Sequence, residues 1–140
     1  METTQFLSAA PTARQAPEAA TFSIADALKE PGQDPLISPT LYIDMLKLDI
    51  GTFARHAHVH RNTVSRAPNA ASVQTYLRQN IRVLAAALNA SGNDLGKALQ
   101  WFRNEPLPPF AYKTAEQLVA DGRADDVIRL IASYAAGAAG

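Results

Sequence analysis

Apolar residues recur three and four positions apart along most of the chain after residue 21, which is the spacing that gathers them on one face of an α-helix. No stretch alternates apolar and polar residues as a half-buried strand does, so the pattern predicts an all-α fold. The strongest stripe predicts a long helix over residues 70–90, buried through Val73, Tyr76, Leu77, Ile81, Leu84 and Leu88. Shorter helices are expected over residues 22–28, 38–48, 49–57, 60–67, 94–102, 114–121 and 125–134.

Capping residues and prolines set the ends of these expected helices. Ser38 precedes Pro39, an arrangement favoured at a helix start, and Thr114 forms a capping box with Gln117. Three prolines within residues 106–109 end the preceding helix, because proline lacks the backbone N–H donor. Further caps are expected at the helix starts Asp49 and Asn69 and at the helix ends Gly92 and Gly122.

The order of these elements divides the chain into four parts. Residues 1–36 begin with a stretch rich in Ala, Thr and Pro, and we expect them to form a disordered or loosely packed extension. Residues 37–69 carry a helix-turn-helix unit, residues 70–92 a connecting helix, and residues 93–140 a small helical unit with a tail. The expected architecture is an N-terminal helix-turn-helix unit that a long helix joins to a small C-terminal helical unit.

Charge is balanced over the whole chain but not along it. The 140 residues contain 13 basic and 13 acidic side chains, yet residues 50–93 contain no carboxylate. An arginine-bearing stretch without acids suits a polyanion, although arginines that simply point into solvent are the alternative. The arginines of this stretch are Arg55, Arg61, Arg66, Arg78 and Arg82.

Composition also bears on the cellular compartment. The chain has no cysteine, so it has neither a disulfide framework nor a thiol site. The longest apolar run, residues 83–88, is far shorter than the roughly 20 residues that cross a bilayer. Residues 1–10 lack the basic start and apolar core of a signal peptide. We therefore expect a cytoplasmic protein without membrane contact.

Residues 48–66 predict two short helices joined by a tight turn, with the small Ala54 where they touch, which is the helix-turn-helix pattern. The second helix would place polar side chains in a major groove, where arginine pairs with guanine and asparagine with adenine. Hydroxyl groups there would hold phosphates, which position a protein without specifying a sequence. A polar surface helix retained for packing is the alternative. The candidate DNA-binding residues are Arg61, Asn62, Thr63, Ser65 and Arg66.

Three histidines alternate with other residues across the same turn: His56, His58 and His60. No cysteine or neighbouring carboxylate completes a metal shell around them, so we expect surface histidines and no metal site. Asp125 and Asp126 diverge by about 100° on a helix and cannot share one proton. The chain has no nucleophile–base pair and no phosphate-binding loop, so neither an enzyme nor a cofactor is expected. Trp101 is expected in the core.

Three ordered motifs in the C-terminal part carry a family resemblance. They read AL-x-WF-x-N-x-PL at residues 98–107, F-x-x-KTA-x-x-LV at 110–119 and GRAD-x-V at 122–127. Together they resemble the C-terminal half of the Xre/MbcA/ParS toxin-binding antitoxins, and with the preceding segment the resemblance covers about residues 37–140. Residues 48–66 resemble the Xre-type helix-turn-helix. Such turns commonly hold glycine where this chain has His58, so His58 would need a positive φ, which histidine tolerates better than most residues.

The resemblance implies an antitoxin of a bacterial type II toxin–antitoxin pair. It would bind a RES-type toxin, which consumes NAD or transfers ADP-ribose, and it would repress its own operon as a homodimer. Residues 133–140, which are small and uncharged until the terminal carboxylate, would enter the toxin's active site. The alternative is a stand-alone transcriptional regulator whose C-terminal half mediates dimerisation. The candidate toxin-binding residues are Lys113, Arg123, Arg129, Tyr134, Gly137 and Gly140.

Overall fold

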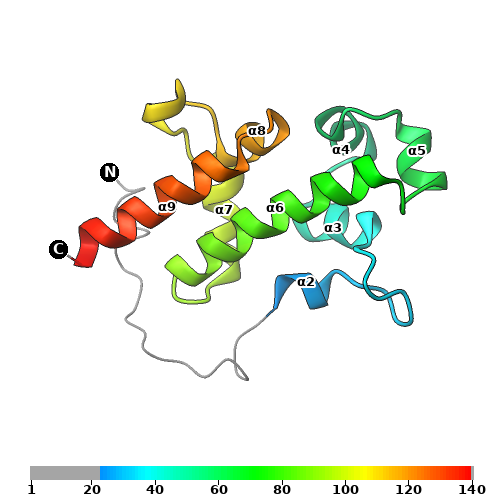
Figure 1. Ribbon diagram of the computed structural model, residues 1–140, viewed down its shortest axis with the longest axis horizontal. Coiled ribbons are helices and arrows are strands. Elements are labelled where there is room, and N and C mark those ends of the chain that lie inside the picture. The colour runs from blue at the N-terminus through cyan, green and yellow to red at the C-terminus, as the bar shows by residue number, and fades with distance from the viewer. Residues whose placement is uncertain (1–22, 140) are drawn as a thin grey trace. The chain divides into compact units, whose positions relative to one another are not determined.

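The computed structural model describes residues 23–139, and this part of the chain is helical without a strand (Figure 1). The all-α prediction is therefore confirmed. Extended pairing among the described residues is limited to one antiparallel bridge between Leu107 and Lys113. The elements are α2 (Ile24–Ala27), α3 (Pro39–Leu46), α4 (Ile50–Ala57), α5 (Arg61–Arg66), α6 (Ala71–Ala90), α7 (Leu95–Asn104), the 3₁₀ turn η2 (Pro108–Phe110), α8 (Ala115–Ala120) and α9 (Ala124–Ala139).

Two compact units make up the described chain. One contains Ile24–Ile81, and the other begins at Arg82 and contains α7, α8 and α9. The division falls inside α6, so the two units share the helix that the sequence pattern treated as a separate connector over residues 70–92.

The core of the first unit is built around three aromatic rings. The Phe53 ring lies 5.7 Å from the Tyr42 ring and 5.3 Å from the Tyr76 ring, measured between centroids. Tilted and edge-on contacts of this kind add to the stabilisation that burial of the rings provides. The hydrophobic pattern predicts an apolar side of α3 made of Leu41, Met45, Leu46 and Leu48. Leu46 is buried as predicted, whereas the other three are half-buried and Tyr42, which the pattern did not include, is fully buried.

Residues 24–36 pack more tightly than the sequence pattern predicted. Ile24 and Leu28 are buried, and the amide of Ser38 donates to the Leu28 carbonyl at 2.7 Å. Of the three large apolar residues in this segment, Ile24 and Leu28 lie in the core and Leu36 is half-buried. The first 22 residues of the extension expected over residues 1–36 lie outside the described residues.

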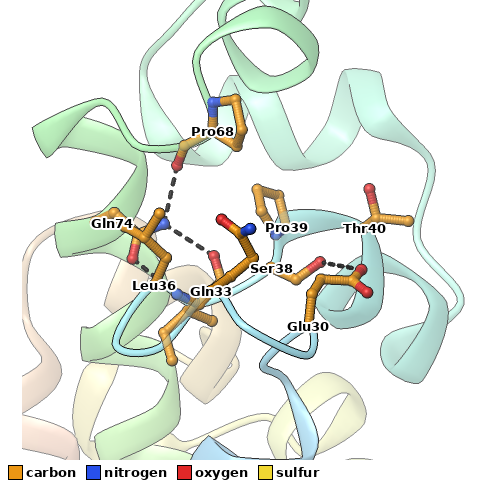
Figure 2. A pocket seen from close by; sticks show the side chains of 9 residues that line it. Glu30, Gln33, Leu36, Ser38, Pro39, Thr40, Pro68 and Gln74 are labelled. Atoms are coloured by element: carbon orange, nitrogen blue, oxygen red, sulfur yellow. Dashed lines mark hydrogen bonds between the residues drawn. The ribbon is translucent and has the colours of Figure 1, made fainter.

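A buried amide, Gln74 of α6, fastens this segment to the rest of the unit (Figure 2). Its Oε1 accepts from the Ile37 amide at 3.0 Å, and its Nε2 donates to the carbonyls of Ile37 at 2.8 Å and Pro68 at 2.9 Å. One turn further along α6, Arg78 donates to the Pro35 carbonyl at 2.9 Å. Gln74 thus satisfies backbone groups that two different loops would otherwise leave without partners.

The second unit packs α8 against both α7 and α9. Its fully buried side chains include Phe102, Leu107 and Leu118, and Trp101 is also buried, as expected for a core residue. Arg103 of α7 forms an ion pair with the buried Glu116 of α8 at 3.2 Å. Outside this core, Arg82 pairs with Asp125 at 2.9 Å and so ties α6 to α9.

Most helix caps predicted from the sequence are present. Ser38 accepts from a backbone amide in the first turn of α3, and both bonds of the Thr114 capping box form. Asp94, which the sequence pattern did not predict as a cap, also accepts from the Lys97 amide at the start of α7. Asp49 lies at the predicted cap position of α4, but the predicted hydrogen bond to a backbone amide does not form. Its carboxylate accepts from the Thr52 hydroxyl at 2.6 Å instead. α6 begins one residue later than predicted, at Ala71, so Ala70 and not Asn69 precedes it, and the predicted Asn69 cap is wrong.

Replacing Gln74 with alanine should destabilise the protein by about 2–4 kcal/mol, because the buried backbone groups of Ile37 would lose their partners. The free energy of unfolding in urea measures this effect. Gln100, an exposed glutamine on α7, provides the matched control, and Gln100→Ala should change stability by less than about 0.5 kcal/mol. Equal stability of the two variants would show that the Gln74 hydrogen bonds contribute nothing net.

Candidate nucleic-acid interface and partner surface

The turn between α4 and α5 forms without glycine. His58 adopts a φ of 61°, in the left-handed region where an L-residue is uncommon. Its amide donates to the Arg55 carbonyl at 3.2 Å, and the Val59 amide donates to the Ala54 carbonyl at 3.0 Å. This pair of bonds is the Schellman closure of a helix end. The positive φ that the resemblance requires of His58 is therefore present.

A histidine also begins the second helix of the motif. The Nδ1 atom of His60 accepts a hydrogen bond from the Asn62 amide at 3.0 Å and so caps α5. A neutral imidazole with its proton on Nε2 provides this acceptor. Sequence reasoning missed the cap because histidine is outside the usual set of capping residues. Within residues 23–139, no group of three or more histidine, cysteine or acidic side chains could hold a metal ion.

α5 presents most of the predicted DNA-binding residues on one face. Val64 is buried and fixes the helix against α4, with which α5 makes its main contacts. Thr63, beside Val64 on the helix, is half-buried. At 3.6 residues per turn, the remaining candidates span an arc of about 140° on the opposite side. The exposed candidates on this arc are Arg61, Asn62, Ser65 and Arg66.

The arginines of the acid-free stretch have different partners. Arg82 pairs with Asp125, whereas Arg78 donates to the neutral Pro35 carbonyl and keeps its positive charge. Within the described residues, Arg61 and Arg66 take part in no ion pair. These two arginines lie together on the exposed arc of α5.

Next to α5, Arg55 joins a short polar chain on α4. Its guanidinium donates to the Thr52 hydroxyl at 3.3 Å, and that hydroxyl donates to the Asp49 carboxylate. The bond from Thr52 lowers the pKa of Asp49 below its usual value. Asp49 therefore offsets part of the positive charge that Arg55 brings to this surface.

The basic residues predicted to bind a toxin are paired within their own unit. Lys113 forms an ion pair with Asp121 at 2.7 Å. Arg123 and Arg129 both bind Asp126. The hydrogen bond from Arg123 has the largest effect in lowering the pKa of this carboxyl, and the bond from Arg129 lowers it further. These contacts are exposed and stabilise the unit only weakly. They nevertheless leave the surface with little net charge.

The predicted tail is helical. α9 continues to Ala139, so the expected helix over residues 125–134 is longer at its C-terminal end than the sequence pattern indicated. Tyr134 is half-buried, and burial raises its pKa, with a further increase from the nearby Glu105 carboxylate. Gly137 is exposed on the last turns of α9, and Gly140 lies outside the described residues. The structure therefore places Tyr134 and Gly137 on one helix with Arg129, while Lys113 and Arg123 precede it.

The segment that joins α7 to α8, residues 107–113, contains a feature that sequence reasoning missed. Tyr112 is 67% exposed, and it is the one large hydrophobic side chain among the described residues to be this exposed. Both Ala111 and Tyr112 have a positive φ, of 57° and 65°. The PPFAY sequence signals a turn through its prolines, but nothing in it indicates that the tyrosine faces solvent.

No protein-family model, curated protein or solved structure matches this chain. No helix in the described part of the chain is both long and apolar enough to cross a lipid bilayer. Function has to be inferred from the exposed face of α5, from the surface of the second unit and from the motifs in the sequence.

Replacing the capping His60 with alanine should destabilise the protein by about 0.5–2 kcal/mol, because the Asn62 amide would lose its acceptor. His60→Ser should retain most of the stability, since serine is among the preferred capping residues. Thermal unfolding of both variants beside the wild type measures the difference. A serine variant as unstable as the alanine variant would show that the imidazole contributes through packing and not through the cap.

Proposed function

We propose that this chain is an antitoxin that binds DNA through α5 and neutralises a RES-type, NAD-consuming toxin through the unit that begins at Arg82. The single observation that most supports the DNA-binding half is the exposed arc of α5. It gathers two unpaired arginines, an asparagine and a serine on a helix whose buried side is held by Val64.

The chemistry of that arc suits the major groove. Arginine can donate two parallel hydrogen bonds to guanine, and asparagine can form a bidentate pair with adenine. Arg61 and Asn62 lie in the first turn of α5, the part of a recognition helix that contacts base edges in helix-turn-helix proteins. Ser65 and Arg66, one turn later, are placed to contact phosphates. A homodimer would present two such helices to an operator with two half-sites.

Support for the toxin-binding half comes from the motifs at residues 98–127. Their residues are the ones that build the second unit. Trp101, Phe102 and Leu107 fill its core, Thr114 caps α8, and Gly122 takes the left-handed φ of 82° between α8 and α9. The large apolar motif positions therefore coincide with the core of this unit, whereas motif residues such as Asn104, Pro106 and Lys113 are exposed. In the proposed complex this unit covers the active site of the toxin, and NAD is the toxin's substrate.

The stand-alone regulator is the second candidate. It shares the DNA-binding half, so DNA binding does not distinguish it from an antitoxin. The two differ in whether the second unit inhibits a RES-domain enzyme. The natural partner to test is a RES-domain protein encoded by the gene adjacent to that of this chain.

Arg61→Ala should weaken binding to the DNA upstream of the chain's own gene by about 1–3 kcal/mol if Arg61 reads a base. If Arg61 contacts a phosphate instead, the variant should release roughly one counterion fewer on binding. The slope of log K against log salt concentration should then become shallower by about 1. Gel-shift titrations at several salt concentrations measure both quantities. Lys97→Ala, which removes one exposed positive charge from α7, is the matched control and should bind normally. Absence of salt-dependent binding by the wild type would refute the DNA-binding proposal.

The full-length chain should inhibit NAD hydrolysis by the adjacent RES-domain protein when the two are mixed at a one-to-one ratio or above. Arg61→Ala should inhibit equally well, since α5 belongs to the other unit. Release of nicotinamide, followed by chromatography, measures the reaction. If the RES-domain enzyme keeps its full activity at a saturating concentration of this chain, the antitoxin proposal is contradicted and the stand-alone regulator is favoured.

A further inference from the structure

The loop of residues 107–113 projects from the second unit. In Figure 1 the yellow segment between α7 and α8 extends away from both α7 and α9. Its outer side consists of Pro108, Pro109, Ala111 and Tyr112, all of them exposed. Its inner side is anchored by Leu107, which is fully buried. The loop is therefore a convex element with an aromatic ring at its outer side.

Hydrogen bonds close this loop upon itself. The Leu107 amide donates to the Lys113 carbonyl at 3.0 Å, which brings the two ends together. The Leu107 carbonyl in turn accepts from the amides of Phe110 and Tyr112, both at 2.9 Å. Two adjacent prolines restrict the backbone further, because each has a nearly fixed φ. The loop thus has few conformations to lose when it binds a partner.

Contacts with the turn between α8 and α9 hold the loop from outside. The Arg123 guanidinium lies over the Phe110 ring, 4.9 Å from its centroid, and Lys113 pairs with Asp121. Arg123 is held in place by its own bond to Asp126 at 2.8 Å. Tyr112 therefore lies on a loop whose two ends are both held in place.

Folding does not account for a tyrosine at this position. With a φ of 65°, glycine or asparagine would be favoured over an aromatic residue, and the exposed ring contributes little to the core. Residues held in unfavourable backbone conformations gather at binding sites, where the surrounding structure maintains them. Tyrosine is also enriched among the residues that dominate binding at protein interfaces. An exposed aromatic ring in this backbone conformation is therefore typical of a residue that binds a partner molecule.

We propose that Tyr112 is the anchor with which this chain occupies the NAD-binding cleft of its RES-domain partner, an inference that rests on the function proposed above. A cleft that binds NAD must receive the flat nicotinamide and adenine rings, and a phenol ring can occupy such a slot by stacking. α9 fits a narrow cleft less well, because it is helical to Ala139 and a helix is about 10 Å across. The loop, not the C-terminal segment, is then the plug.

Occupation of the cleft by the ring makes inhibition competitive with NAD. The test measures nicotinamide release by the adjacent RES-domain protein over a range of NAD concentrations, with full-length wild type, Tyr112→Asn and Tyr112→Phe. Asparagine tolerates a positive φ, so Tyr112→Asn should unfold at a temperature no lower than the wild type. Its inhibition constant should nevertheless rise at least about tenfold. Tyr112→Phe, which keeps the ring, should stay within about threefold of the wild type.

Two controls separate the ring from its surroundings. Ala111→Gly eases the neighbouring left-handed residue without removing the ring, and it should inhibit like the wild type. A chain truncated after Tyr134 removes the end of α9, where residues 135–137 are exposed, and it should also inhibit like the wild type. Size-exclusion chromatography of Tyr112→Asn should show the same oligomeric state as the wild type.

The possible failures are distinguishable. If the wild type itself does not inhibit, the proposed function is wrong, and this inference is wrong with it. If the wild type inhibits and Tyr112→Asn inhibits equally, the function stands and the anchor is elsewhere. Loss of inhibition on truncation alone would return the role to the end of α9. A change of oligomeric state in Tyr112→Asn would mean that the ring contacts a second copy of the chain.

Discussion

The structure depends on backbone reversals that place a residue in the left-handed region one or two positions after a helix. α3, α4 and α8 are followed by such residues at Lys47, His58 and Gly122. Each reversal satisfies carbonyl groups that a helix end leaves without partners, and it turns the chain sharply enough for the next helix to pack back. The amide after each reversal donates to the carbonyl five residues earlier, in the pairs Leu48–Ile43, Val59–Ala54 and Arg123–Leu118.

These reversals matter because most helices here are too short to persist alone. An isolated helix below about 12–15 residues is marginal in water, and α5 has 6 residues. α5 is maintained by the turn at His58, by the His60 cap and by burial of Val64. The candidate DNA-binding face therefore owes its geometry to residues that would not themselves touch DNA. A change in the turn would alter the presentation of Arg61 without altering its chemistry.

In the second unit, the residues that pack the core differ from the residues that face solvent. The motif residues fill the core and cap the helices, so they report on the fold of the unit. The exposed residues outside the fixed motif positions, Pro108, Pro109 and Tyr112 among them, contribute little to that fold. Because a stable unit can vary its exposed loop freely, the loop is where recognition of one partner in preference to another is expected to arise.

The sequence by itself determined the helical class, most of the helix boundaries and the caps at Ser38 and Thr114, since these follow from local spacing and capping chemistry. It also identified α5 and its polar residues, because a short polar helix after a tight turn is a local pattern. Only the tertiary structure decided that Gln74 fastens residues 24–36, that Arg78 and Arg82 have internal partners, and that Tyr112 faces solvent. Each of these depends on which groups meet across distances in sequence of up to 43 residues. No local pattern contains that information.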